Sequence, residues 1–214
     1  MAVRLSMGHE TIMMRPWIFA AVVAAALCNQ QAWSAGNAEA GAAKSAICQA
    51  CHGATGNSVN PDWPNLAGLG ADYIAQQLQN FKDAKRSNPM MSPMAAPLGT
   101  DDMADLGAYF SSQKIAEQEF DPASMKPGSK LYRGGNASRD IPACMACHGP
   151  DGLGMQAAKF PALRGQQSGY FVKQLHDYAS GARATGPNNI MQTIATRLTD
   201  EDMRNLAAYV KGIR

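Results

Sequence analysis

The five-residue pattern Cys-x-x-Cys-His occurs twice, at residues 48–52 and at residues 144–148. Two thiols three residues apart on one helical turn can each bond to a vinyl group of the same haem, and the histidine that follows can then bind the haem iron. The doubled pattern therefore predicts two covalently attached haem c groups. It also supplies the candidate cofactor-binding residues, with the two histidines as iron ligands: Cys48, Cys51, His52, Cys144, Cys147 and His148.

Other uses of paired cysteines fit this chain less well. Tetrathiolate zinc sites space their pairs by roughly 15–20 residues, whereas Cys51 and Cys144 are 93 positions apart. A thioredoxin-like redox motif needs a βαβ setting, and no strand-like alternation flanks either copy. Structural disulfides would not require a histidine at the same place twice. Haem attachment is the interpretation that uses every residue of the pattern.

The N-terminal residues have the features of a signal peptide. Arginines precede an apolar run from Trp17 to Leu27, which is too short to span a bilayer. Small residues follow, and residues 32–35 are the expected cleavage region. The fifth cysteine, Cys28, lies inside this leader, and the leucine before it suits a lipoprotein anchor poorly. We expect residues 1–35 to be removed and the mature protein to be exported to the bacterial periplasm, which is oxidising.

The similarity between the two halves extends far beyond the cysteines. His52 and His148 are 96 positions apart, and later matches are 97 and then 100 positions apart. The matches include Pro64/Pro161, Leu66/Leu163, Gly68/Gly165, Tyr73/Tyr170, Gln77/Gln174, Arg86/Arg183, Met91/Met191, Asp102/Asp202 and Tyr109/Tyr209. Such repetition predicts two tandem domains, at residues 36–117 and 127–214, joined by a Pro- and Ser-rich linker at residues 118–126.

Each half is expected to be helical, with long loops. An Ala-rich stretch over 38–50 leads into the first motif, and apolar spacing predicts helices over 73–85 and over 170–178, the latter with Ser168 as N-cap. Thr199 and Asp202 form an acidic variant of the capping box at the last helix, and residues 100–110 repeat its pattern. An apolar stripe marks that last helix: Met203, Leu206, Tyr209, Val210 and Ile213. The sequence therefore predicts an all-α protein.

The sixth iron ligand decides whether such a protein carries electrons or acts on a substrate. The other histidines supply no repeated ligand, because His9 is in the leader and His176 aligns with Gln79. Met91 and Met191 match between the halves, 39 and 43 residues after their histidines. A thioether is an established partner of histidine on cytochrome c iron. We therefore predict Met91 and Met191 as the remaining iron ligands.

Two neighbouring methionines leave the choice in the first half open. Met90 and Met94 align with Ile190 and Ile194, which favours apolar packing over ligation. Methionine is a common filler of protein cores, so the alignment alone does not identify the ligand.

A proline follows each motif at nearly the same distance. Pro64 lies 12 residues after His52, and Pro161 lies 13 residues after His148, each in the pattern Pro-x-Leu-x-Gly. A carbonyl oxygen there could accept the free ring N–H of the histidine, which would fix its tautomer and strengthen it as a ligand. A simple turn is the alternative interpretation.

The chain resembles the dihaem cytochromes c4, of the class I cytochrome c type, across essentially the whole mature sequence. This resemblance implies two tandem cytochrome c-like domains related by a pseudo-twofold axis, two His/Met haems, and periplasmic electron transfer within a respiratory chain. The implied partners are a donor of the quinol–cytochrome c reductase type and an acceptor of the terminal oxidase type. The resemblance rests on the following residues: both Cys-x-x-Cys-His motifs, Pro64–Gly68, Pro161–Gly165, Tyr-x-x-x-Gln-Leu at Tyr73 and Tyr170, Met91, Met191, Ala108–Phe110 and Ala208–Val210.

The charge is unevenly distributed between the halves. Residues 36–117 hold five Lys/Arg against eight Asp/Glu, and residues 127–214 hold eleven against six, so their net charges are −3 and +5. Surface charges of opposite sign can steer different partners to the two domains. The alternative interpretation is that both are ordinarily solvated surfaces with no such role. Because positive surroundings favour a reduced haem, the second haem is expected to have the higher potential.

Several other functions are disfavoured or remain as alternatives. The exported chain has no basic, aromatic-interleaved face for nucleic acid, and no later stretch resembles a membrane span, so membrane association would be through partners. The prediction is an electron carrier and not an enzyme. The cytochrome subunit of a periplasmic dehydrogenase would share every motif seen here, and a dihaem peroxidase would need one open iron, against which the paired methionines argue. The oligomeric state is left open.

Overall fold

The computed structural model describes residues 35–214, so Cys28 and nearly all of the expected signal peptide lie outside the described residues. Within this range the chain is helical and contains no strand, only isolated bridges. None of the helices in the described range has the length and apolar character needed to cross a bilayer. The prediction of an all-α protein is confirmed.

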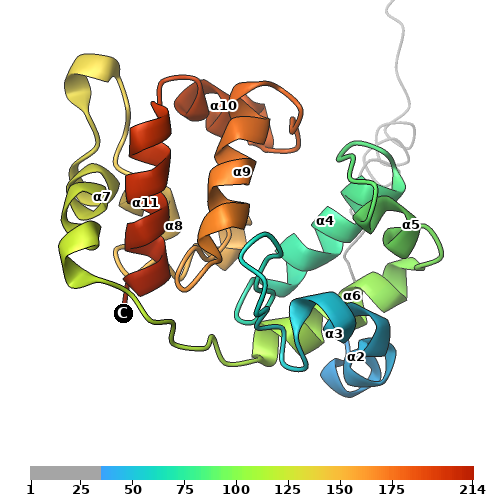
Figure 1. Ribbon diagram of the computed structural model, residues 1–214. Helices are drawn as coiled ribbons and strands as arrows, with labels where there is room; N and C mark the ends of the chain where they lie inside the picture. The colour runs from blue at the N-terminus through green and yellow to red at the C-terminus, as the bar shows by residue number, and fades with distance from the viewer. Residues whose placement is uncertain (1–34) are drawn as a thin grey trace, which may run out of the picture. The chain divides into compact units, whose positions relative to one another are not determined.

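Two similar sets of helices follow one another along the chain (Figure 1). The first set consists of α2 (Ala38–Lys44), α3 (Ala46–His52), α4 (Ala71–Lys82), α5 (Met91–Ala95) and α6 (Thr100–Ser112). The second consists of α7 (Pro122–Gly134), η1 (Ala137–Arg139), α8 (Met145–His148), η2 (Gln156–Ala158), α9 (Ser168–Ala179), η3 (Pro187–Asn189), α10 (Ile190–Ala195) and α11 (Asp200–Gly212). In the first set α6 packs against α2 and α4, and in the second α11 packs between α7 and α9.

A glycine allows the closest helix crossing in each domain. A Cβ atom at Gly41 in α2 would lie 2.0 Å from the carbonyl oxygen of Asp105 in α6. One at Gly128 in α7 would lie 2.0 Å from the carbonyl oxygen of Asn205 in α11. Because no real Cβ approaches an oxygen so closely, only glycine lets the first and last helices of each domain meet at these points.

The last helix of each domain begins as the sequence predicts. The amide of Asp202 donates to Thr199 Oγ1 at 3.1 Å, and the Thr199 amide donates back to Asp202 Oδ2 at 2.8 Å, which completes the capping box. In the first domain Gly99 replaces the threonine, so only the return bond to Asp102 remains, at 2.9 Å. The predicted apolar stripe of α11 is buried, with exposures of 0–4%.

One predicted helix start is wrong, and another helix starts inside the predicted linker. Ser168 is the first residue of α9 and not its N-cap; the amide of Tyr170 donates instead to the Pro61 carbonyl of the first domain, at 2.9 Å. That contact satisfies a free N–H of the first turn without a side-chain cap. Helix α7 begins at Pro122, inside the segment expected to be irregular, because Asp121 accepts from the amides of Ala123 and Ser124 and proline suits a first helical position.

The predicted helix over 73–85 also ends early. Helix α4 stops at Lys82, and Ala84 has a φ of +56°, in the left-handed region that ends helices. The Ala-rich stretch over 38–50 forms two helices rather than one, with a break at the fully buried Ser45.

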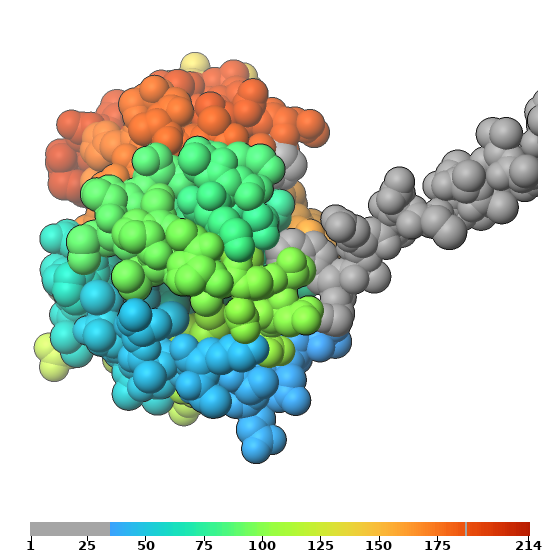
Figure 2. Space-filling view, turned by 90° about the vertical axis from the view of Figure 1, so that its right-hand side faces the viewer, coloured from blue at the N-terminus to red at the C-terminus, as the bar shows by residue number. Residues whose placement is uncertain are grey.

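The two domains exchange equivalent polar contacts. Arg86 after α4 donates to the Tyr170 hydroxyl at 3.0 Å and to Gln174 at 2.6 Å. Arg183 after α9 donates to the Tyr73 hydroxyl at 2.9 Å and to Gln77 at 3.0 Å. Since these pairs match in the sequence repeat, the exchange has the pseudo-twofold symmetry expected of the tandem domains. Figure 2 shows the blue-to-green first domain directly against the orange-to-red second domain.

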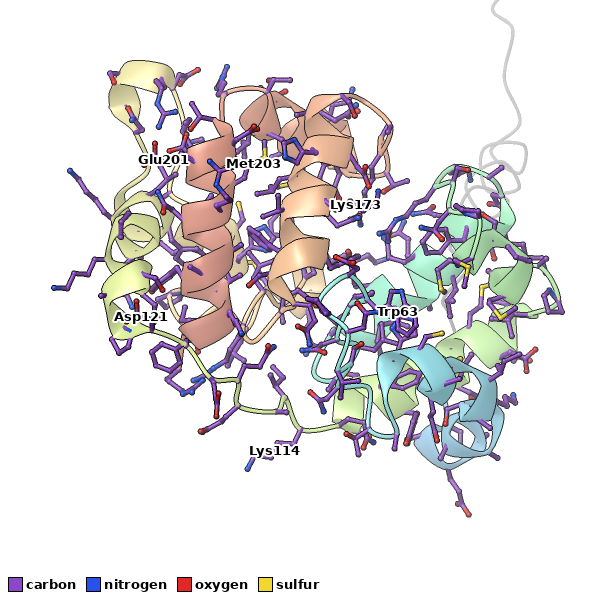
Figure 3. The ribbon with its side chains drawn as sticks, in the orientation of Figure 1. Trp63, Lys114, Asp121, Lys173, Glu201 and Met203 are labelled. Carbon is purple, nitrogen blue, oxygen red and sulfur yellow. The ribbon has the colours of Figure 1, made fainter. Side chains whose placement is uncertain are left out.

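The segment between α6 and α7 is bonded to both domains. The Asn57 side chain donates to the carbonyl of Lys114 at 3.0 Å and accepts from the amide of Ala116 at 2.9 Å. The side chain of Ile115 fills the space beside two glycines, because a Cβ at Gly68 or at Gly165 would come within 2.7 Å of it. Figure 3 labels Lys114 on this segment, along with Asp121 at its end, where α7 starts.

Candidate haem-binding sites

Each Cys-x-x-Cys-His motif forms a helical turn that ends at its histidine. In the first domain the motif is part of α3, and in the second it forms α8, with Cys144 as the N-cap residue. The residue after each histidine is a glycine with a positive φ, 81° at Gly53 and 79° at Gly149, which stops the helix there. All four thiols are free and half-buried. The predicted thiol and imidazole groups are therefore grouped as one set per domain.

Both histidine rings are held by the predicted proline carbonyls. Nδ1 of His52 lies 2.8 Å from the carbonyl oxygen of Pro64, and Nδ1 of His148 lies 2.9 Å from that of Pro161. A carbonyl oxygen can only accept, so Nδ1 carries the proton and Nε2 keeps a free lone pair, which is the form that binds iron. The alternative of a simple turn is excluded.

Burial keeps these imidazoles neutral. The exposures of His52 and His148 are only 6% and 8%. This burial lowers the pKa of both rings, and the hydrogen bond to the proline carbonyl only partly offsets it. Burial likewise raises the pKa of the Cys48 thiol, and it raises that of Cys144 to about 11. Each site therefore presents one thiol, Cys48 or Cys144, that burial keeps neutral at pH 7, beside a neutral imidazole.

The proline carbonyls are positioned by a repeated loop contact. In the first domain the amides of Leu66 and Ala67 both donate to the carbonyl of Gly56, at 2.7 and 3.1 Å. In the second domain the amides of Leu163 and Arg164 donate to the carbonyl of Gly152, at 2.7 and 3.0 Å. The Pro-x-Leu-x-Gly loop is thus fastened two residues after its proline, which fixes the oxygen that the histidine meets.

The two predicted methionine ligands occupy equivalent places. Met91 begins α5, which packs on α4, and Met191 lies in α10, which packs on α9. Both side chains are half-buried, whereas Met90 is 62% exposed and Met94 is 44% exposed. Met191 and Cys144 border the same buried apolar cluster of the second domain. Burial thus favours Met91 over its two neighbours.

Sequence reasoning missed a residue that supports the second haem site and a pair that joins the domains. The hydroxyl of Tyr132, which is fully buried, donates to the carbonyl of Gly149 at 2.7 Å and so supports the turn after His148. Arg86 and Arg183 were visible as a repeated pair but had no assigned role. A repeated arginine that follows a repeated Tyr-x-x-x-Gln was the signal that could have identified the contact between the domains.

The described residues suit haem c. Two half-buried thiols three residues apart, followed by a neutral imidazole with its free nitrogen unprotonated, form the donor set that covalent haem attachment needs. The set is present in full in both domains. It occurs at Cys48, Cys51 and His52 and again at Cys144, Cys147 and His148, and the protein accordingly carries two covalently attached haem c groups.

Comparisons with known proteins agree with this site chemistry. The cytochrome c family model matches residues 38–114 and 125–214. The chain is 43% identical to cytochrome c4 of Pseudomonas aeruginosa over 183 residues, which cover 85% of this chain and 91% of that relative. It is 38% identical to a Thiomonas intermedia protein named thiosulfate dehydrogenase electron acceptor, covering 83% of this chain and 81% of that one.

A solved structure extends the likeness to the fold. The crystal structure of reduced recombinant cytochrome c4 from Pseudomonas stutzeri matches with a TM-score of 0.81 and 43% identity, over 84% of this chain and 100% of that one. The match includes both domains and therefore their tandem arrangement. The chain belongs to the cytochrome c family and, within it, to the dihaem cytochromes c4.

Proposed function

We propose that this dihaem electron carrier works in the bacterial periplasm as part of a respiratory chain. It receives electrons from a partner of the quinol–cytochrome c reductase type and delivers them to a terminal oxidase. Residues 1–35 are the signal peptide and residues 36–117 are the first haem domain. Residues 118–126, within which α7 begins, lead into the second haem domain at residues 127–214. The protein makes and breaks no substrate bond.

The site geometry supports the following roles for the residues. The four motif cysteines hold the porphyrins by thioether bonds, and His52 and His148 bind the irons through Nε2. Met91 and Met191 complete the iron coordination. Haem iron, when bound, supplies the one-electron chemistry. The proline carbonyls keep each ring in the ligating tautomer and orientation.

One observation carries the choice of carrier over enzyme. Equivalent methionines lie half-buried in equivalent short helices, α5 and α10, one in each domain. A thioether ligand on both irons would leave neither iron open to a substrate. A dihaem peroxidase would need one methionine to be absent or displaced.

Carbon monoxide binding tests this proposal. The haem-loaded protein is reduced with dithionite at neutral pH, exposed to carbon monoxide and examined by absorption spectroscopy. An unchanged spectrum is expected, because both irons are six-coordinate. Binding by about half of the haem would show one open iron and would favour peroxide or gas chemistry instead.

A second function is supported by a specific relative. The Thiomonas intermedia protein is named as the electron acceptor of a thiosulfate dehydrogenase, so this chain could be the cytochrome subunit or acceptor of a periplasmic dehydrogenase. Purification under mild conditions distinguishes a dehydrogenase subunit from a mobile carrier. A catalytic flavoprotein or other dehydrogenase that co-purifies in fixed ratio would favour the subunit role, whereas a free dihaem protein would favour the mobile carrier.

A further inference from the structure

The peptide group that receives the first histidine is hydrogen-bonded at both ends. The carbonyl of Pro64 accepts from Nδ1 of His52 at 2.8 Å. The N–H of the same peptide group belongs to Asn65, and it donates to Oε1 of Gln166 at 2.8 Å. Gln166 is a residue of the second domain. A side chain of the second domain is therefore separated from the first histidine by a single peptide group.

The amide of Gln166 is fixed in this orientation. Its Nε2 donates to the carbonyl of Asn65 at 3.0 Å, and its Oε1 also accepts from the amide of Gln167 at 2.9 Å. The side chain cannot be turned over, because the Asn65 N–H only donates and the Asn65 carbonyl only accepts. With an exposure of 6%, Gln166 is also shielded from competing water.

The second domain lacks the equivalent contact. The peptide group that receives His148 joins Pro161 to Ala162, and within residues 35–214 the Ala162 N–H donates no hydrogen bond. At the repeat offset of 97, Ala162 replaces Asn65 and Leu69 replaces Gln166. Leu69 and Ala162 belong to one buried apolar cluster. The pseudo-symmetry of the domains is therefore broken beside their histidines.

Hydrogen bonds at the two ends of a peptide group reinforce one another. An N–H that donates polarises the group and makes its carbonyl oxygen a stronger acceptor. A stronger acceptor draws the Nδ1 proton, so the imidazole becomes a more basic, more electron-donating ligand. Such a ligand favours oxidised iron and lowers the reduction potential.

We propose that Gln166 is a positioning residue that acts through the Pro64–Asn65 peptide group on His52 and lowers the reduction potential of the first-domain haem relative to the second. The inference rests on His52 being the iron ligand proposed above. The contact between the domains would then do more than hold them together, because docking of the second domain would set the reduction potential of the haem in the first.

The variant Gln166→Met tests this role, because methionine keeps the length of the side chain and removes both hydrogen bonds to Asn65. The matched control is Gln167→Met. Gln167 is 8% exposed and its amide bonds to the Ser58 carbonyl and the Asn65 side chain, but not to the Pro64–Asn65 peptide group. Haem potentials are measured by a redox titration in which NMR resolves the two domains.

In Gln166→Met the potential of the first haem is expected to rise while that of the second stays unchanged, and Gln167→Met should leave both close to the wild type. An unchanged first-haem potential in Gln166→Met, or an equal rise in both variants, would overturn the proposal. The carbon monoxide test is run on the same samples. Binding of the gas by the wild type would contradict His/Met ligation itself, whereas unchanged potentials without gas binding contradict only the role of Gln166.

A measurement on the unmodified protein does not depend on whether the variants fold. In the reduced, diamagnetic state the ring N–H resonance of His52 is expected further downfield than that of His148, because its acceptor is the more polarised carbonyl. Equal shifts, or the reverse order, would count against the proposal.

Discussion

Arg86 of the first domain donates to the hydroxyl of Tyr170 in the second domain at 3.0 Å, while Arg183 donates to Tyr73 at 2.9 Å. Both arginines are buried, with exposures of 8% and 4%. Burial alone would raise the pKa of Tyr170, but the two guanidinium groups lower it. The tyrosine hydroxyls thus serve as acceptors for buried cations, and the contact depends on each domain supplying the acceptor that the other needs.

Removing one of these acceptors should loosen the contact. Tyr170→Phe leaves Arg86 with one hydrogen bond fewer in a buried site, and we expect a loss of about 1.5–3 kcal/mol in the free energy of unfolding. Denaturant unfolding of the haem-loaded protein measures it. Tyr178→Phe is the control, because Arg183 stacks on that ring at 4.6 Å and, within residues 35–214, the Tyr178 hydroxyl makes no hydrogen bond. A loss as large in the control would show that removing any hydroxyl beside these guanidinium groups is destabilising, and that the hydrogen bond from Arg86 to Tyr170 is not the cause.

The three methionines near the first haem site should differ in their effect on ligation. Met91→Ala is expected to open the first iron, so that about half of the reduced haem binds carbon monoxide. Met90→Ala and Met94→Ala should leave the spectrum unchanged, because those side chains are largely exposed. Gas binding in the Met94 variant instead would move the ligand to that position. Met191→Ala gives the matched result for the second domain.

Asp202 should make stability depend on pH at the acid end. The hydrogen bond from Arg139 and the contacts at Thr199 lower the pKa of this carboxyl from 3.8 to about 2, against the opposing effect of burial. Since the folded pKa is depressed, the stabilisation is fully present above pH 4 and is lost as the pH falls towards 2. Asp202→Asn is expected to cost about 1–2 kcal/mol at pH 7.

Urea unfolding of the wild type and of Asp202→Asn between pH 7 and pH 2 measures how much the Asp202 carboxylate stabilises the fold. The difference between wild type and variant should shrink as the acid limit is approached. A difference that stays constant down to pH 2 would mean that shape and hydrogen bonding at Asp202, rather than its charge, stabilise the helix start.

The uneven charge of the two domains should appear in the order of their potentials. Because the second domain carries +5 and the first −3, the second haem is expected to have the higher potential. Exposed charges are screened over about 10 Å at 0.1 M salt and about 3 Å at 1 M, so part of the gap should close as salt is raised. The part that arises from Gln166 should persist, since that contact is buried. A domain-resolved titration with the reverse order at low salt would contradict the effect of charge.

The haem sites could be predicted from the sequence because their parts lie close together along the chain. His52 and the Pro64 carbonyl are 12 residues apart, and His148 and the Pro161 carbonyl are 13 apart in the other half of the repeat. The capping box at Thr199 is equally local. Each of these features needs only one helical turn or one loop, for which the residue types are sufficient.

The contact between the domains could not be predicted in the same way. Asn65 and Gln166 are 101 residues apart, and neither has an equivalent in the other half. The wrong N-cap at Ser168 has the same origin, because its usual role is replaced by the Pro61 carbonyl from the other domain. Local sequence rules describe the ends of a helix in water, and this helix begins in a protein contact instead.

The anchored segment at Lys114–Ala116 affects how strongly the domains must attract one another. A short tether holds its ends at a local concentration in the millimolar range, so the second domain meets the first without the loss of translational freedom that separate molecules would suffer. Few polar contacts then suffice to keep the two domains together. Two halves produced as separate chains would keep every residue at the contact, but each half would have to find the other from dilute solution and would lose the advantage of the tether.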